Sequence, residues 1–354
     1  MEPLRPGVII LLGSGETLPS SGKAHEFAAR RLPENPNIAI LETPAGFELN
    51  ADRVAGKIKD FLEVRLTNYN PNIFQVPARK KDTDHSPDDP EIVSPLFQAD
   101  EILLGPGSPT YAVRQLQDSL AYEIIKARIH AGAALVLSSA ATLAFGRYTI
   151  PVYEIFKVGE DPYWKDGLDF FGAFNLPLSI VPHWNNNDGG GEVDTSHCFI
   201  GKPRFDALYQ ILPEDQVILG IDDHTSIAID LDAHTCHVMG NGRVTVLKNR
   251  EEYIFNSGEQ FDLNLIGDPI FPPAGEGIDP GVWDQAKAAH QQRLEQAAQA
   301  PPPPPDEVLA LVTERETIRM QKDWAASDQL RDQIADLGWQ VNDTPDGPEL
   351  LPLE

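Results

Sequence analysis

The sequence contains little cysteine and offers no cofactor motif. Its 354 residues include two cysteines, Cys198 and Cys236, too few for a disulfide framework or a cysteine-rich metal site. Neither cysteine follows a strand-like run in the way an elbow nucleophile does, which argues against a cysteine-based glutaminase. The Gly13-Ser14-Gly15 turn lacks the further spaced glycine of a dinucleotide-binding loop. We therefore expect neither a metal nor another cofactor.

Positive charge is also scarce. The chain has 28 lysines and arginines against 54 aspartates and glutamates, a formal net charge of −26. This balance argues against general binding to nucleic acid or to an anionic membrane. No apolar run reaches the length of a membrane span, and the segment before Gly13 lacks the apolar core of a signal peptide. We expect a soluble, cytoplasmic protein, and the sequence leaves its oligomeric state open.

Up to about Leu265, short apolar runs alternate with helical patterns. Val8–Leu12 and Asn37–Leu41 are strand-like, and a helical pattern from His25 to Arg31 lies between them. Strands that are apolar on both faces are typical of a parallel sheet covered by helices on both sides. We predict an α/β fold with a mostly parallel sheet, whose ligands bind at the carboxyl ends of the strands. Further along, Gly240-Asn241-Gly242 predicts a hairpin turn.

The most informative stretch begins with the apolar run Ala134–Leu137. The run stops at Ser138 and Ser139 and then turns into a helix-compatible segment of small residues. Many hydrolases present a nucleophile on such a strand-to-helix turn. Because successive side chains of a strand point to opposite faces, we expect only one of these two serines to face a pocket. Taken alone, the stretch also fits a buried strand that ends in a polar turn.

Two further segments supply what a serine nucleophile needs. Gly105-Pro106-Gly107 ends an apolar strand, and such a turn lets backbone amides approach a ligand closely. Pro182-His183-Trp184 follows another strand and makes His183 a candidate general base. We expect the backbone N–H groups of Gly107 and Ala140 to hold the oxyanion.

Together these segments resemble dipeptidase E and the cyanophycinases, which are serine peptidases with a class I glutamine amidotransferase-like fold. The resemblance rests on the Gly-rich turn, the Ser139-Ala140 elbow and Pro182-His183-Trp184, and it covers about residues 6 to 265. Its Ser-Ala match implies that Ser139, rather than Ser138, is the nucleophile that faces the pocket. It also implies that Glu154 is the acid of a catalytic triad. The Gly-Ile-Asp-Asp stretch that ends at Asp223 makes that residue the second candidate. The implied substrate is a small peptide or amide, aspartyl-linked as in the family.

Two departures from the family pattern leave a second hypothesis open. Leu137 and Ala141 stand where the family has glycines, which relieve crowding around the nucleophile. One hypothesis is therefore a serine hydrolase, in which Arg114, Arg147 and Arg204 are candidates for binding a substrate carboxylate. The other is a catalytically degenerate ligand-binding or scaffolding protein with an RNA-related C-terminal module.

The rest of the chain predicts two further parts after a first domain at residues 1–272. Residues 273–305 are interpreted as a connector, with a polar helix from Val282 to Ala298 and a stiff polyproline spacer at Pro301–Pro305. Residues 306–354 carry two helical stripes and predict a small helical hairpin.

The stretch at 307–350 resembles the C-terminal segment of cysteinyl-tRNA synthetases. In those enzymes the segment accompanies the anticodon-binding region, so the resemblance implies tRNA as a partner. Residues 306–354 contain twelve acidic and four basic residues, a net charge of −8. Because phosphate binding depends on lysine and arginine, this charge disfavours tRNA.

Overall fold

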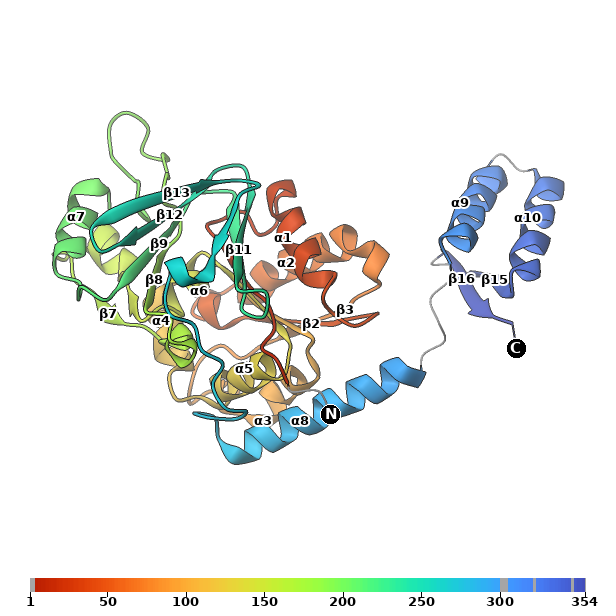
Figure 1. Ribbon diagram of the computed structural model, residues 1–354, viewed down its shortest axis with the longest axis horizontal. Helices are drawn as coiled ribbons and strands as arrows, with labels where there is room; N and C mark the ends of the chain where they lie inside the picture. The colour runs from red at the N-terminus through yellow and green to blue at the C-terminus, as the bar shows by residue number, and fades with distance from the viewer. Residues whose placement is uncertain (1–3, 300–304, 321–322, 345–346, 354) are drawn as a thin grey trace. The chain divides into compact units, whose positions relative to one another are not determined.

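The computed structural model describes residues 4–299, 305–320, 323–344 and 347–353 (Figure 1). The chain forms two compact units, Met1–Arg293 and Leu294–Glu354. Each unit is described by itself below.

The first unit is built on an eight-stranded sheet with the order β14-β11-β10-β1-β5-β4-β2-β3. Five neighbouring strands are parallel: β1 (Ile9–Leu12), β5 (Ala134–Ser138), β4 (Glu101–Leu104), β2 (Asn37–Leu41) and β3 (Asn72–Val76). The other three extend the sheet in antiparallel fashion: β10 (Thr225–Asp230), β11 (Thr235–Gly240) and β14 (Gln260–Asp262). The mostly parallel α/β sheet expected from the apolar runs is therefore present.

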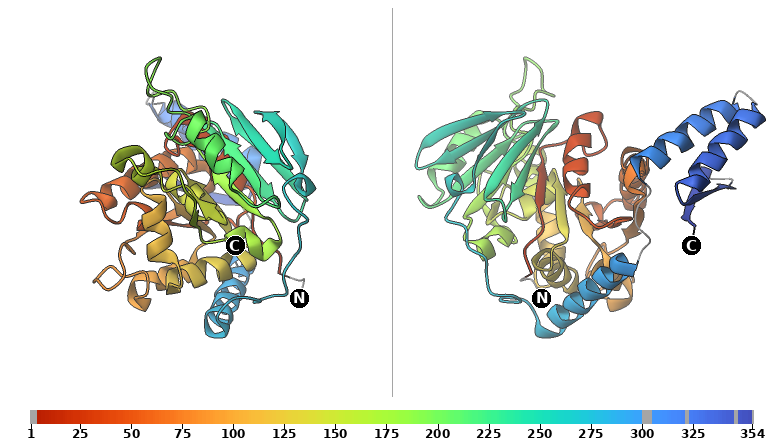
Figure 2. Two further views of the ribbon diagram at one scale, coloured as in Figure 1. Left: turned by 90° about the vertical axis from the view of Figure 1, so that its left-hand side faces the viewer. Right: turned by 45° about the vertical axis from the view of Figure 1, so that its right-hand side comes forward.

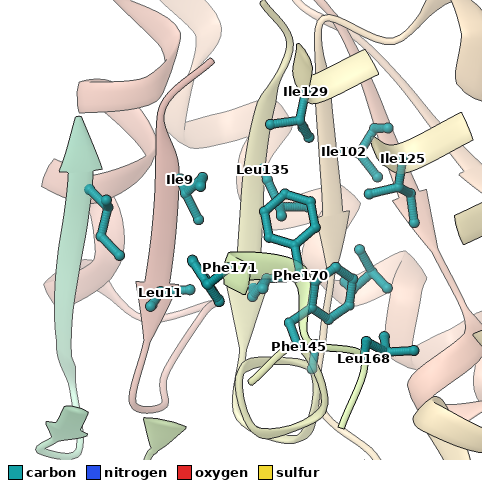
Figure 3. Packing of buried hydrophobic residues seen from close by; sticks show 14 of the residues in the cluster. Ile9, Leu11, Ile102, Ile125, Ile129, Leu135, Phe145, Leu168, Phe170 and Phe171 are labelled. Carbon is teal, nitrogen blue, oxygen red and sulfur yellow. The ribbon is translucent and has the colours of Figure 1, made fainter. Parts of the chain in front are cut away.

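Helices cover both faces of this sheet because its strands are apolar on both sides. Ile10 and Leu12 pack against α1 (Gly22–Ala29) and α2 (Ala51–Arg65). Ile9 and Leu11 point to the opposite face, into the larger core drawn in Figure 3. That core also contains side chains of three helices, α3 (Pro90–Val93), α4 (Pro109–Leu116) and α5 (Leu120–His130).

A second sheet has four strands in the order β13-β12-β9-β8. Its strands are β13 (Glu251–Asn256), β12 (Arg243–Lys248), β9 (Val217–Ile221) and β8 (Leu178–Val181). One face of this sheet joins the larger core, and the other packs against α7 (Lys202–Gln210). In Figure 2 the green and teal strands that follow β8 gather on one side of the first unit. A short ribbon, β6 (Tyr148–Thr149) with β7 (Lys165–Asp166), lies outside both sheets.

The hairpin predicted at Gly240-Asn241-Gly242 is wrong. The turn does connect two strands, β11 and β12, but β11 pairs with β10 and β14, whereas β12 pairs with β9 and β13. The Asn241 N–H is bonded to the carbonyl of His224 and the Gly242 N–H to Thr225 Oγ1. These bonds to another segment direct the chain from one sheet to the other.

Helix α8 (Pro280–Gln299) differs from the expected polar connector. Val282, Trp283 and Ala286 are buried in the core of the first unit. The guanidinium of Arg293 forms an ion pair with Asp100 at 2.6 Å. Most of the segment expected to be a linker is therefore part of the first unit.

The second unit contains two helices and a small β-hairpin. The helices are α9 (Asp306–Met320) and α10 (Trp324–Asp336), and the strands are β15 (Trp339–Thr344) and β16 (Gly347–Pro352). Val308, Ile334, Trp339 and Val341 form its core. The two expected helices are present, and residues 339–341, which follow them, belong to a two-stranded sheet. Most of the predicted proline spacer lies outside the described residues.

Among the described residues, no helix is both long enough and apolar enough to span a membrane.

Candidate active site

Ser139 occupies a sharp turn between β5 and helix α6 (Ala140–Ala144). Its backbone has φ 51° and ψ −111°, a conformation that residues other than glycine rarely adopt. Such strain costs roughly 1–3 kcal/mol and is found mostly at functional positions. The turn brings the Ser139 hydroxyl to 2.9 Å from Nε2 of His183. Ser138, by contrast, is buried and donates to the Glu16 carboxylate at 2.8 Å.

A continuous chain of hydrogen bonds joins Ser139, His183 and Asp223. His183 Nδ1 lies 2.7 Å from Asp223 Oδ1, and both side chains are largely buried, with 14% and 19% of their surface exposed. Because Asp223 is ionised, Nδ1 must carry the proton that is donated to it. Nε2 is then free to accept the hydroxyl proton of Ser139.

The acid beside His183 is Asp223 and not Glu154, the candidate implied by the family resemblance. Glu154 begins a short π-helical turn, Glu154–Val158, and its Oε2 is buried without a hydrogen-bond partner among the described residues. Asp223 follows β9, which pairs in parallel with β8 in a register that sets Val181 beside Gly220. The segments after these two strands, which carry His183 and Asp223, therefore leave the sheet together.

Several groups hold the Asp223 carboxylate in its charged form. Burial by itself would raise the pKa of Asp223, but hydrogen bonds from His183, Ser14 and Asn186 and the charge of His183 lower it to about 2. The Asn186 amide donates to Oδ2 at 3.1 Å, and the Asp223 N–H is bonded to Asn185 Oδ1 at 2.8 Å. The carboxylate is therefore both ionised and fixed in orientation over the neutral pH range.

The residue after His183 anchors the histidine to the neighbouring strand. The Trp184 N–H is bonded to the Ile221 carbonyl at 3.0 Å. The indole ring packs so closely on Gly220 that a Cβ there would lie 2.5 Å from Trp184 Cδ2. The Cys198 N–H is bonded to the His183 carbonyl at 3.1 Å. These contacts explain why the Pro-His-Trp and Gly-Ile-Asp-Asp stretches belong to one site.

The two expected oxyanion donors lie next to Ser139. Gly107 and Ala140 line the same pocket as Ser139, and neither backbone N–H has an acceptor among the described residues. A Cβ on Gly107 would lie 1.9 Å from the Pro44 carbonyl oxygen, so only glycine fits there. Gly105, the other glycine of this turn, directly follows β4 and is absent from the pocket lining. Only the second glycine of the pair therefore reaches the pocket.

The two departures from the family pattern leave this geometry intact. Leu137 and Ala141 are fully buried, and both pack into the larger core. Leu137 is paired with Leu11 on one side and with Leu104 on the other. Its side chain thus fills core volume, and Ser139 still lies within hydrogen-bonding distance of His183.

A pocket of about 240 Å³ opens beside Ser139. We call it the Ser139 pocket. Its lining consists of Gly107, Pro109, Ser139, Ala140, Leu143, Val152, Tyr153, Phe156, Lys157, His183, Cys198 and Phe199. Burial raises the pKa of the Cys198 thiol, which keeps it protonated and unreactive.

A second, larger pocket of about 860 Å³ shares Tyr153 with the first. It is lined by Glu154 and by three other charged residues, Glu48, Lys80 and Arg114, and we call it the Glu154 pocket. Among the three arginines proposed to bind carboxylates, only Arg114 lines either pocket. Arg147 forms an ion pair with Asp215, and Arg204 donates to the Ile200 carbonyl.

Sequence reasoning misses the polar groups that surround the acid. Ser14 draws notice only as part of a possible nucleotide loop, and Asn185 and Asn186 carry no motif of their own. Their position directly after Pro-His-Trp is the signal that could identify them, because the loop after a catalytic base lies close to its partner. Within the described part of the chain, no cluster of three or more potential metal-ligating side chains is found.

The C-terminal unit matches a known family in sequence. Residues 302–348 match the cysteinyl-tRNA ligase anticodon binding domain. The cysteine–tRNA ligase of Chlamydia felis is 47% identical over 48 residues, which are 14% of this chain and 10% of the ligase. That of Lactobacillus helveticus is 50% identical over 42 residues, 12% of this chain and 9% of the ligase. The chain thus spans only about a tenth of the length of these relatives.

The first unit resembles a solved peptidase in structure. A peptidase from an acI-B1 Actinobacterium superposes with a TM-score of 0.58 and 20% sequence identity, over 73% of this chain and 97% of that one. This degree of similarity establishes a common fold. The chain therefore joins a first unit with a peptidase fold to a short segment similar to the C-terminal end of cysteine–tRNA ligases.

Proposed function

We propose that this protein is a serine hydrolase that cleaves a small peptide or amide. The observation that carries this proposal is the hydrogen-bonded chain from the strained Ser139 through His183 to the ionised Asp223. A strained serine alone, or a buried His–Asp pair alone, would fit a structural role. A serine, a histidine and a carboxylate joined by hydrogen bonds in this order form the geometry that activates a hydroxyl for attack.

The reaction that we propose proceeds through an acyl-serine. Ser139 Oγ attacks the substrate carbonyl carbon while His183 Nε2 takes the hydroxyl proton, and Asp223 stabilises the resulting imidazolium. The N–H groups of Gly107 and Ala140 stabilise the oxyanion. As the C–N bond breaks, His183 returns the proton to the leaving amine. Water then attacks the acyl-serine with the same proton transfers and releases the acid.

Labelling with a fluorophosphonate probe tests this proposal directly. The full-length protein should react at Ser139, as shown by mass spectrometry of the labelled peptide. Ser139→Ala should abolish the reaction. Ser138→Ala is the matched control, because it removes the neighbouring hydroxyl, which faces Glu16, and should keep the reaction. An unlabelled wild-type protein with native circular dichroism would instead support the degenerate, ligand-binding hypothesis.

We infer that the C-terminal unit does not bind tRNA through its phosphates and has a different role. Arg315 forms two hydrogen bonds with the Asp343 carboxylate at 2.8 and 2.9 Å, and Arg319 and Arg331 contact the same group. These are all the arginines of residues 306–354, and the one lysine, Lys322, lies outside the described residues. Arginines committed to an internal carboxylate are poorly placed to bind phosphates. A structural or protein-docking role fits the unit better.

A further inference from the structure

The lining of the Ser139 pocket points to the side chain that the enzyme accepts. We propose that the substrate residue bearing the scissile carbonyl has an apolar side chain, such as leucine or phenylalanine, and not aspartate. This inference rests on the proposed hydrolase function and specifies its substrate class.

The walls of the pocket are apolar. They are formed by Leu143 of α6, Val152, Phe156, Phe199 and Pro109. At about 240 Å³ the pocket is smaller than the roughly 300–1,000 Å³ typical of ligand-binding clefts, so it suits a single side chain. Ser139, His183, Gly107 and Ala140 all line this pocket. A carbonyl oxygen bound by Gly107 and Ala140 would therefore place its own residue in this pocket.

Within the described part of the chain, no guanidinium lines the pocket to pair with a substrate carboxylate. Arg147 and Arg204 have other partners, and Arg114 lines the Glu154 pocket, where it lies 5.2 Å from the Tyr111 ring centroid. Among the described residues that line it, only Lys157 carries a cationic side chain, which is exposed and lies with Nζ 4.6 Å from the Phe156 ring centroid. An exposed lysine remains hydrated, so an ion pair with it would compensate little for the burial of a substrate carboxylate. An aspartate side chain inside would lose its hydration without gaining a buried partner.

Charged groups are instead concentrated in the adjoining Glu154 pocket. It contains both signs, Lys80 and Arg114 against Glu48 and Glu154. The hydroxyl of Tyr153, the residue shared by the two pockets, donates to the Gly107 carbonyl at 3.3 Å. This division places the apolar part of a substrate against Ser139 and leaves its charged ends for the second pocket.

A matched dipeptide series tests the inference with the full-length protein. The substrates are Leu-Ala, Phe-Ala, Asp-Ala and Arg-Ala, and the rate of alanine release gives kcat/KM for each. Burial of a leucine or phenylalanine side chain should raise kcat/KM about 10- to 100-fold above that of Asp-Ala. Equal rates, or a preference for Asp-Ala or Arg-Ala, would overturn the inference.

A pair of phenylalanine variants tests whether this pocket is responsible. Phe156→Ala should lower kcat/KM for Leu-Ala and Phe-Ala about tenfold, because one wall of the pocket opens to water. Phe271→Ala removes a partly exposed ring outside the pocket lining and should keep both rates. An apolar preference that survives Phe156→Ala unchanged would show that the Ser139 pocket does not select the substrate.

Fluorophosphonate labelling separates this inference from the function on which it rests. Labelled protein that prefers Asp-Ala would refute the apolar pocket and keep the serine hydrolase. Protein that is not labelled at Ser139 would refute the hydrolase itself, and with it the substrate class.

Discussion

At the residue scale, the site depends on a few backbone conformations that non-glycine residues rarely adopt. Ser139 and His183 both have positive φ, at 51° and 52°, and so do Cys198 and Phe199 beside them. Hydrogen bonds to neighbouring segments hold these residues, such as the one from the Cys198 N–H to the His183 carbonyl. Several strained backbone conformations that lie close together and are held by hydrogen bonds are typical of a preorganised site.

The choice of acid gives a prediction for two matched variants. Asp223→Asn should lower kcat about 10⁴-fold, because an asparagine stabilises the wrong tautomer of His183 and cannot stabilise the imidazolium. Glu154→Gln makes the same chemical change at the acid implied by the family resemblance, and should cost less than about tenfold. Steady-state measurement of kcat for both variants, on the dipeptide that the wild type cleaves best, would show which acid supports catalysis. A larger loss of kcat in Glu154→Gln than in Asp223→Asn would identify Glu154 as the catalytic acid.

Buried histidines should make the protein sensitive to acid. His25 is completely buried, and burial lowers its pKa from 6.5 to about 4. The unfolded chain therefore takes up a proton at a higher pH than the native chain does, so stability rises with pH between about 4 and 6.5. This single group should remove about 3 kcal/mol of unfolding free energy as the pH falls through that window.

Urea denaturation at several pH values would measure this effect. His25→Leu should flatten the dependence of unfolding free energy on pH. His85→Leu, at an exposed histidine, should leave that dependence as in the wild type. Parallel curves for wild type and His25→Leu would contradict the prediction.

At the element scale, the pairing of β8 with β9 assembles the catalytic groups. The parallel register of Val181 with Gly220 brings the two strand ends to the same edge. Trp184 then packs on Gly220, where no larger residue fits. The base and the acid are thus positioned by one pair of neighbouring strands, and Ser139 comes from the other sheet.

The C-terminal β-hairpin carries the acid that holds the arginines of its unit. Asp343 of β15 contacts Arg315, Arg319 and Arg331, and its hydrogen bonds with Arg315 and Arg319 lower its pKa. Asp343→Asn should release three positive charges that repel one another, and so weaken the unit. In protein that remains folded, it should also raise tRNA affinity by about tenfold at low salt.

Filter binding at several salt concentrations, with circular dichroism to verify folding, would measure this change. Asp332→Asn changes the net charge equally at an exposed position outside the cluster, so it serves as the control. If wild-type protein already binds tRNA tightly at moderate salt, the arginines are available to phosphates after all.

At the scale of the whole molecule, α8 decides where the first unit ends. The buried guanidinium of Arg128 donates to the carbonyls of Ala99 and Ala286, which ties α5 to α8. Together with the buried Trp283 and the Arg293–Asp100 ion pair, this contact makes α8 a structural part of the fold.

Two truncations should therefore behave differently. A chain that ends at Gln299 keeps all of α8 and should retain fluorophosphonate labelling and the melting temperature of the first unit. A chain that ends at Pro273 loses the buried side chains of Val282, Trp283 and Ala286 and should be destabilised by roughly 5 kcal/mol or more. Calorimetry on both would measure this. Loss of labelling in the longer truncation would show that the second unit supports the site.

Local patterns in the amino-acid sequence are enough to predict the elements and most of the candidate site. Continuous apolar runs specify buried strands, and the break at Ser138-Ser139 specifies a turn, because both signals lie within a few consecutive residues. The resemblance to dipeptidase E and the cyanophycinases rests on such short motifs, and it allows Ser139, His183 and Gly107 to be proposed as partners before the structure is known. The second unit is recognisable because residues 307–350 resemble the C-terminal segment of cysteinyl-tRNA synthetases, and the matching residues extend as far as Gly347.

Which distant segments meet is settled by tertiary packing. Glu154 and Asp223 both follow Ser139 in the chain and both carry a carboxylate. The residues around each of them do not show which one lies beside His183. The pairing of β8 with β9 places Asp223 at His183. The same limit explains the wrong hairpin at Gly240–Gly242 and the docking of α8, since both depend on contacts with segments far away in sequence. Local patterns fix what each segment forms, whereas packing between segments fixes which side chains react together.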